Sequence, residues 1–235
     1  ALLLFADCQK EFEYKYVFNM TEKKKVSWDE IRLGIFVHLV LENGVKSLFR
    51  NENEFISFAK EIQVNEEWKG IDLEQAILLI KVFFERHKDR YSNKSKTEQY
   101  LSAELGGLKF IGFADRIDFN DGGICIVDYK TGKSTVYPRQ REWQLGFYAL
   151  AASKFGKVNR IMLDMLRHEK PLEFELDEKG NAFAVNSDRM NSFNIYQIEE
   201  ELIKTAYEIQ DAYRVGFKPC AYEKNCEFCN EYVYG

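Results

Sequence analysis

The chain has 235 residues, with 33 lysines and arginines against 38 aspartates and glutamates, for a net charge of −5. An apolar fraction of 46% with 30% charged residues excludes a wholly disordered chain, and no apolar run approaches the ~18 residues of a membrane helix. The acidic balance argues against a protein coated in positive charge for nucleic acid but allows a local basic track. Residues 1–5 lack the basic flank and cleavage site of a signal peptide, so we expect a cytoplasmic protein without membrane contact. Because the first residue is Ala1, we also expect a domain cut from a longer protein.

The first expected helix covers residues 27–44. Ser27 can cap this helix while Glu30 reaches back to the cap, and Asn43-Gly44 is expected to end it. Three further segments have apolar residues at helical spacing, at residues 72–90, 139–155 and 194–215.

Strand patterns begin after a polar segment, residues 94–99, which is expected to form a loop. They lie at residues 108–119, 124–131, 160–167 and 173–176. This order of elements predicts an α/β fold, with a mixed central sheet flanked by helices and a helical N-terminal part. We expect a single domain with three parts, namely a helical part (1–95), a sheet core (96–180) and a C-terminal helix with a cysteine-rich tail (194–235).

The strongest chemical signal is a hairpin that carries two aspartates and a lysine. If the turn centres on Asp121-Gly122, Asp115 faces Asp128 across the strands, where like charges are destabilising without a cation. Lys130 follows Asp128 by two residues and therefore lies on the same face. Carboxylate oxygens favour Mg²⁺ or Mn²⁺, and a metal with a lysine suits phosphodiester hydrolysis. The alternative is a surface hairpin with ordinary charges, but a charged residue in an apolar strand favours a site.

Motifs in chain order carry a resemblance to a known family. They are Leu4-Phe5-x-x-Cys8-x-x-x-Phe12-x-Tyr14, Gly34-x-x-x-His38-x-x-Leu41, Gly112-x-x-Asp115, Asp128-Tyr129-Lys130-Thr131-Gly132 and Gln144-x-x-x-Tyr148. Together they resemble the RecB-type branch of the PD-(D/E)xK nuclease superfamily, and the N-terminal motif resembles AddB-like helicase–nuclease subunits. The resemblance implies a restriction-endonuclease-like sheet core.

The resemblance also implies a role for each matching residue. The implied metal ligands are His38, Asp115, Asp128 and the backbone carbonyl of Tyr129. Lys130 is the implied catalytic lysine, and the implied helpers near DNA are Gln144 and Tyr148. Taken alone, His38 is better explained as a partly buried structural histidine, and the hairpin reverses this in favour of a ligand. Without the family, the pair Gln144 and Tyr148 is better explained as a solvated helix face.

Basic residues gather after the second aspartate, with no acid between residues 129 and 141. They are Lys130, Lys133, Arg139 and Arg141. Such residues favour sequence-independent phosphate contacts, although a mobile basic loop is the alternative. Arg116 is expected to be structural, paired with an acid such as Glu104, and His87 and His168 are expected at the surface.

Five cysteines without a secretory signal argue against a disulfide framework. Those in the last 16 residues indicate metal ligation or incidental thiols. The family resemblance implies that Cys8, Cys220, Cys226 and Cys229 bind a [4Fe–4S] cluster, which leaves Cys125 as a buried strand residue. The tail here reads C-x5-C-x2-C, whereas the family tail reads C-x2-C-x5-C. A zinc site and reduced thiols therefore remain alternatives.

The hairpin predicts metal-dependent phosphodiester hydrolysis, and the resemblance implies a Mg²⁺- or Mn²⁺-dependent deoxyribonuclease, an exonuclease rather than an endonuclease. We expect it to belong to a helicase–nuclease that processes DNA ends in recombinational repair together with a partner subunit. The alternatives are a non-catalytic DNA- or subunit-binding scaffold of the same fold, and a stand-alone CRISPR-associated exonuclease.

Overall fold

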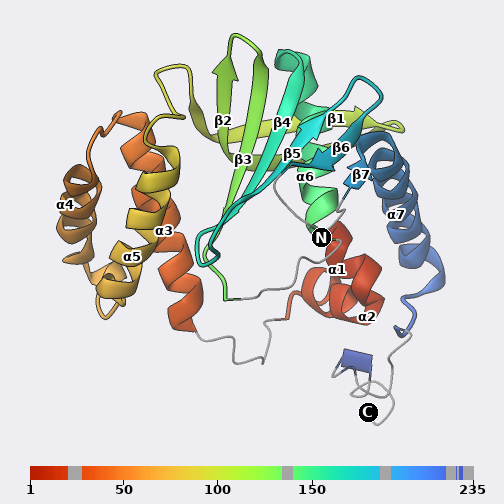
Figure 1. Cartoon of the computed structure of the whole chain (residues 1–235). Helices are drawn as coiled ribbons and strands as arrows, with labels where there is room; N and C mark the ends of the chain where they lie inside the picture. Colours follow the sequence, from red (N-terminus) through yellow and green to blue (C-terminus); the bar gives the residue numbers. More distant parts are fainter. Residues whose placement is uncertain (21–27, 134–139, 186–191, 221–225, 227, 230–235) are drawn as a thin grey trace.

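The computed structural model describes residues 1–20, 28–133, 140–185, 192–220, 226 and 228–229 (Figure 1). The α-helices are α1 (Leu2–Asp7), α2 (Gln9–Phe12), α3 (Trp28–Lys46), α4 (Glu52–Gln63), α5 (Leu73–His87), α6 (Gln140–Ala152) and α7 (Ile195–Val215). A π-helical turn, η1 (Glu13–Val17), and 3-10 turns, η2 (Glu66–Trp68) and η3 (Ser153–Phe155), accompany them. The strands are β1 (Lys96–Leu105), β2 (Leu108–Asn120), β3 (Gly123–Lys130), β4 (Val158–Met165), β5 (Leu172–Leu176), β6 (Asn181–Ala184) and β7 (Ser192–Asn194).

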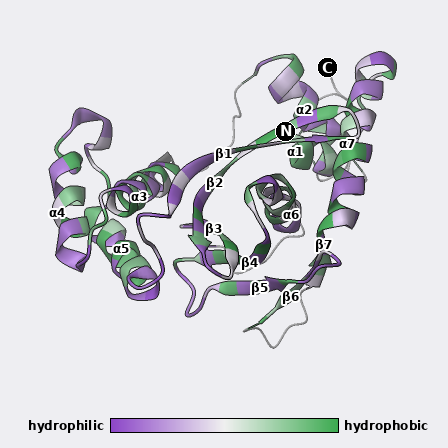
Figure 2. Ribbon diagram, turned by 90° about the horizontal axis from the view of Figure 1, so that it is seen from above, coloured by the Kyte–Doolittle hydropathy of each residue, from purple (hydrophilic) through white to green (hydrophobic). Residues whose placement is uncertain are grey.

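The strands form one mixed sheet in which each strand pairs with its neighbours in chain order. All neighbouring pairs are antiparallel except β3 and β4, and α6 lies between these two strands in the chain. Seen from above, the sheet curls around α6, while α3, α4 and α5 lie outside the curl (Figure 2). The predicted α/β fold with a helical N-terminal part is thus confirmed.

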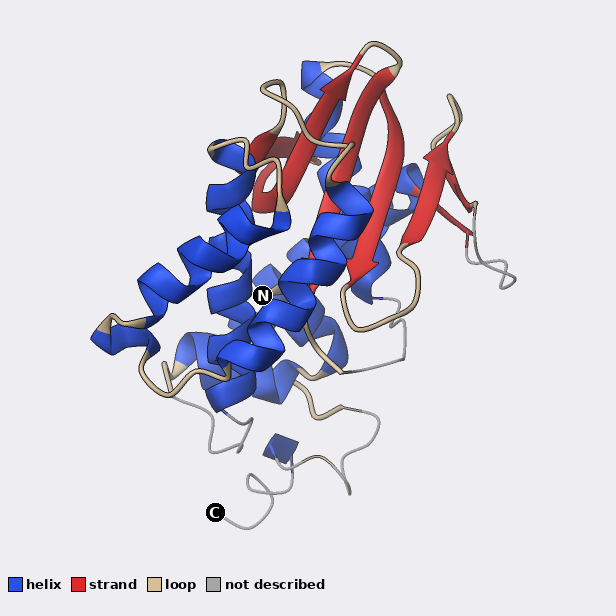
Figure 3. Ribbon diagram, turned by 60° about the vertical axis from the view of Figure 1, so that its left-hand side comes forward, coloured by secondary structure: helices blue, strands red, loops and turns tan. Residues whose placement is uncertain are grey.

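Two apolar cores lie on opposite faces of β3. Ile126 belongs to the core around α6, whereas its neighbour Val127 belongs to the core under α3, α4 and α5. The helices and the sheet form distinct layers in Figure 3. Because β3 is covered on both faces, the charged Asp128 near its end is almost completely buried. None of the described helices is long and apolar enough to cross a membrane.

The predicted end of the first helix is wrong, because α3 continues through Gly44 to Lys46. A Cβ atom on Gly44 would lie 1.9 Å from Phe55 Cε1 of α4. This glycine therefore permits close packing of two helices and does not cap one.

The loop expected over residues 94–99 is also wrong, because β1 begins at Lys96. Lys96 pairs with Ile117 and Thr97 with Arg116. The segment is polar because β1 is the edge of the sheet, where charged residues guard against pairing with other chains. The sequence analysis also did not predict α1, α2, α4, β6 and β7, which are short elements or lie among polar residues.

Substituting Gly44 with valine should lower the free energy of unfolding by about 1–3 kcal/mol, because the added methyl groups overpack the contact with Phe55. Lys46→Val, at a more exposed position of the same helix, is the matched control and should change it by less than about 0.5 kcal/mol. Urea denaturation measures both. Equal stability of the two variants would contradict this account of Gly44.

Candidate active site

The β2–β3 hairpin places the two predicted aspartates side by side. Arg116 pairs with Val127 and Asn120 with Gly123, which is the register predicted from the turn. Asp115 lies one position beyond the last of these pairs. One of its carboxylate oxygens, Oδ2, accepts a hydrogen bond from the backbone N–H of Tyr129 at 2.6 Å. The hairpin thus joins the first aspartate directly to the strand that carries the second.

Asp128 is the most unusual charge in the site, because its side chain is only 1% exposed. Lys130 Nζ lies 2.5 Å from Oδ2 of Asp128. No described residue offers that buried oxygen a well-aligned hydrogen bond. Burial, together with the nearby charge of Asp115, raises the pKa of Asp128 to about 6, although Lys130 acts to lower it. Burial has therefore removed most of the water from the Asp128 carboxylate. A cation bound beside it would compensate for this lost hydration.

His38 reaches the same place from α3. Its Nδ1 lies 3.5 Å from Oδ1 of Asp115, and its ring contacts the edge of Tyr129. Burial acts to lower the pKa of His38, but the hydrogen bond and charge of Asp115 outweigh it and raise the pKa. The helix can approach because a Cβ on Gly34 would already lie 2.9 Å from Thr131 Oγ1.

Glu98 is a site residue that the sequence analysis missed. Each of Glu98, His38 and Asp115 offers a ligand atom, and these atoms all lie within 4.8 Å of one another. The three residues line a cavity of about 600 Å³ between α3 and the hairpin. Glu98 has a φ of +45°, which is rare outside glycine. Burial, followed by the charges of Asp115 and Glu42, raises the pKa of Glu98. A single glutamate in a polar segment carries no sequence signal for this role.

The donor set fits a divalent cation such as Mg²⁺ or Mn²⁺. Two carboxylates, Glu98 and Asp115, and the imidazole of His38 bring their ligand atoms within 4.8 Å of one another. Asp128 is not part of this group, and its buried Oδ2 lies 2.5 Å from Lys130 Nζ. Hard oxygen donors select hard cations over soft ones. Lys130 beside this carboxylate places a positive charge where a phosphate would carry negative charge.

Gln144 and Tyr148 of α6 lie next to the hairpin, and Tyr148 is close enough for the charges of Asp128 and Asp115 to act on it. Gln144 Nε2 donates a hydrogen bond to the Tyr148 hydroxyl at 2.8 Å. A Cβ on Gly112 would lie 2.9 Å from Phe147 and 3.0 Å from Tyr148, so this glycine allows α6 to approach. The alternative of a solvated helix face is wrong for Tyr148, which is buried.

The predicted basic track is only partly described. Lys130 pairs with Asp128, and Lys133 Nζ pairs with Glu30 at 2.7 Å. Arg141 is half-buried at the start of α6, and Arg139 lies outside the described residues. Of the four bases, Lys130 and Lys133 are therefore each paired with an acid.

Behind the site, a buried network corrects two expectations. His87 was expected at the surface, but it is fully buried, and Arg116 pairs with Asp118 instead of Glu104. Arginine can only donate, so His87 Nδ1 accepts from Arg116 and the opposite nitrogen donates to Asp164 at 2.8 Å. Burial and the charge of Arg116 lower the pKa of His87 to about 4, which keeps the ring neutral. His168 is half-buried.

Four cysteines from the two ends of the chain form a second cluster of potential ligands. Their sulfur atoms all lie within 4.8 Å of one another, and the residues are Cys8, Cys220, Cys226 and Cys229. Cys125 lies apart from them, buried in β3 as expected. These are the four residues that the resemblance implies as ligands of a [4Fe–4S] cluster.

Comparison with known proteins gives the family of the chain. The family model described as the PD-(D/E)XK nuclease superfamily matches residues 1–231. The chain belongs to this superfamily. No curated protein matches the chain. A candidate exonuclease from Eubacterium rectale is 13% identical over 98% of this chain and 85% of its own, with a TM-score of 0.49. A protein named SSO0001 is 15% identical over 97% of this chain and 93% of its own, with a TM-score of 0.36. Family membership therefore rests on the match over residues 1–231.

Protons should compete with a divalent cation for this site. Asp128 has a pKa of about 6 and the pKa of His38 is raised, so both are protonated in acid and must lose their protons to bind metal. Titration calorimetry with Mn²⁺ should show affinity falling at least about tenfold per pH unit below pH 6, since at least one proton is displaced per ion. Asp128→Asn should make this dependence less steep, because only His38 then has to lose a proton. An affinity that does not change between pH 5 and 7 would contradict the assignment.

Proposed function

We propose that this chain is a metal-dependent deoxyribonuclease domain whose active site consists of Asp115, Asp128, Lys130 and His38, with Glu98 as an additional ligand. Family membership supports nuclease chemistry. The observation that carries the site assignment is the buried carboxylate of Asp128 held 2.5 Å from Lys130 Nζ, beside a second aspartate. A surface hairpin with ordinary charges would leave such a carboxylate in water.

In this proposal, Mg²⁺ or Mn²⁺ would be held by four side chains and one backbone carbonyl. The side chains are those of Asp115, Asp128, His38 and Glu98, and the carbonyl is that of Tyr129. The cation would supply an activated water and neutralise charge on the phosphate. Lys130 would donate to the oxygen on which negative charge develops, because its ammonium is already fixed beside Asp128.

The substrate in this proposal is DNA. Gln144 and Tyr148 would contact the strand next to the scissile phosphate, since α6 borders the hairpin at Gly112. Lys133, Arg139 and Arg141 would contact phosphates. The proposed biological setting rests on sequence resemblance alone. It is exonuclease action on DNA ends, in the cytoplasm, by a helicase–nuclease that works with a partner subunit.

The test is cleavage of single-stranded DNA with Mg²⁺. Lys130→Ala and Asp128→Ala should each lower kcat by at least about 100-fold, because each removes a charge that acts on the reacting phosphate. Glu98→Gln should raise the Mg²⁺ concentration needed for half-maximal rate by about tenfold or more. Glu104→Gln, an exposed position on the same strand, is the matched control and should behave as wild type.

Circular dichroism and urea denaturation would show that the variants remain folded. Undiminished cleavage by folded Asp128→Ala and Lys130→Ala would overturn the site. A wild-type chain that binds DNA without taking up Mn²⁺ and without cleaving would indicate the scaffold function instead.

A further inference from the structure

The four-cysteine cluster has the dimensions of a site for one metal ion. The sulfur separations are 3.6 Å for Cys8–Cys226, 3.7 Å for Cys8–Cys229 and 3.7 Å for Cys229–Cys220. Four thiolates about 2.3 Å from one tetrahedral zinc ion lie about 3.8 Å apart. Thiolates at the four corners of an iron–sulfur cube lie about 6 Å apart, because the cube itself separates them.

The surroundings of two sulfur atoms also suit thiolate ligands. The backbone N–H of Glu11 donates to Cys8 Sγ at 3.4 Å, and the backbone N–H of Cys220 donates to Cys229 Sγ at 3.3 Å. Such bonds stabilise charge on a sulfur ligand. Cys8 and Cys229 are also buried, so their thiolates need a cation for compensation.

We propose that Cys8, Cys220, Cys226 and Cys229 bind a single structural zinc ion. A tetrahedral site made only of thiolates selects zinc among the common divalent cations. The tail order C-x5-C-x2-C is also reversed from that of the resembling family.

The position of the cluster gives the zinc site a role in the architecture. It joins the start of the chain to the segment after α7, where Phe5 and Phe12 pack against Ala212 and Phe217. The N-terminal residues Ala1, Leu2 and Leu3 line one cavity together with Gln144 and Tyr148. Zinc would therefore hold α1 against the flank of the proposed DNA site.

The experiment is metal analysis of the full chain, produced with zinc and iron both supplied and purified without oxygen. We expect about one zinc per chain, little iron and no broad absorption near ~400 nm, the region typical of iron–sulfur centres. About four irons with acid-labile sulfide, a single iron, or no metal would each overturn the proposal.

Cysteine variants show which residues bind the metal. A cobalt titration of the wild-type chain gives a second readout in case a variant folds poorly. Cys220→Ser should weaken zinc binding at least tenfold in competition with a chromogenic chelator, whereas Cys125→Ser, at a buried cysteine outside the cluster, should not. Co²⁺ added to metal-free wild type should give the intense visible bands of tetrahedral cobalt thiolate. Zinc retention by Cys220→Ser, or an octahedral cobalt spectrum, would contradict the assignment.

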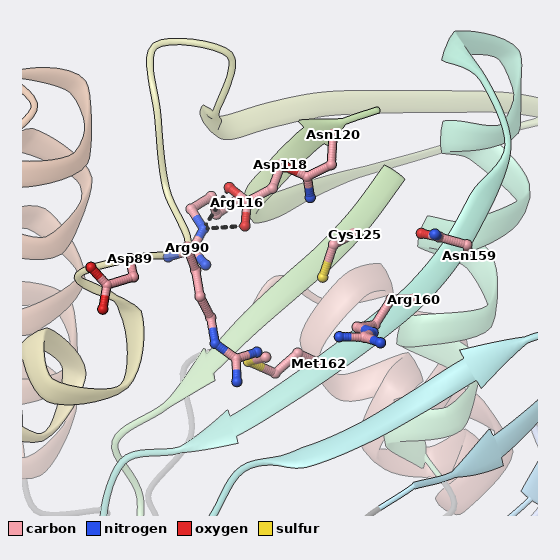
Figure 4. Close-up of a pocket in the computed structure, with 9 residues that line it drawn as sticks. All are labelled: Asp89, Arg90, Arg116, Asp118, Asn120, Cys125, Asn159, Arg160 and Met162. Atoms are coloured by element: carbon pink, nitrogen blue, oxygen red, sulfur yellow. Dashed lines mark hydrogen bonds and ion pairs between the residues drawn. The ribbon is translucent and has the colours of Figure 1, made fainter. Parts of the chain in front are cut away.

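The side chain of Tyr129 supports a second inference, which rests on the proposed active site. Tyr129 lies between Asp128 and Lys130, but its side chain points into the core under α3 and α5. Its hydroxyl accepts a hydrogen bond from Arg116 Nη1 at 2.6 Å, and Arg116 is fully buried. Figure 4 shows Arg116 and its bonds to Asp118 at the wall of a pocket on this side of the sheet.

The network behind Tyr129 is tied to several elements. Arg116 of β2 contacts His87 of α5, and His87 contacts Asp164 of β4. On the other side of the strand, the backbone N–H of Tyr129 holds Asp115. The geometry points to Arg116 and the Tyr129 hydroxyl as positioning residues that fix the end of β3, and with it the proposed metal ligands.

Tyr129→Phe removes only the anchoring hydroxyl. Partners behind metal ligands typically affect metal affinity or activity 10- to 100-fold, so we expect Mn²⁺ affinity and kcat to fall about tenfold while KM for DNA is unchanged. Tyr91→Phe is the matched control, because Tyr91 is buried in the same core, stacks on Phe83 and donates to a backbone oxygen away from the site.

A purely structural hydroxyl would lower thermal stability in both variants and leave Mn²⁺ affinity equal in both. That result would overturn the positioning role. If wild type binds Mn²⁺ but does not cleave DNA, the proposed function fails, while the calorimetric comparison of Tyr129→Phe with Tyr91→Phe still decides the positioning role.

Discussion

The burial of the Asp128 carboxylate is the constraint around which this molecule is organised. A carboxylate with 1% exposure loses most of its hydration, and that loss has to be offset by nearby charge. Lys130 supplies part of the compensation, while Asp115 adds repulsion. The net effect of these charges is that a cation would bind favourably near the end of β3. The neighbouring elements determine which atoms would surround that cation.

The two-sided covering of β3 explains how this demand is maintained. The α6 core and the α3–α5 core exclude water from alternate residues of the strand. A salt bridge in water is worth little, but a buried charge that loses its partner is costly. The site is therefore inseparable from the packing of the hairpin, with His38 supplied by α3 and Glu98 by the edge strand β1.

Local chemistry explains which parts could be predicted from the sequence. The hairpin register follows from the turn Asp121-Gly122, so the position of Asp115 beside the end of β3 that carries Asp128 could be predicted. Glu98 could not, because its role depends on how β1 curls towards α3. The predictions for Gly44 and His87 were wrong for a similar reason. Gly44 looks like a helix cap in the sequence, but it allows Phe55 of another helix to approach. His87 looks like a surface residue, but Arg116 and Asp164 bury it.

The most direct test of the central claim is a crystal structure of the protein soaked in Mn²⁺, with anomalous data collected at the manganese absorption edge. The account predicts an anomalous peak within bonding distance, about 2.2 Å, of carboxylate oxygens of both Asp115 and Asp128. A structure in which manganese occupies other sites, while Lys130 alone still contacts Asp128, would contradict it.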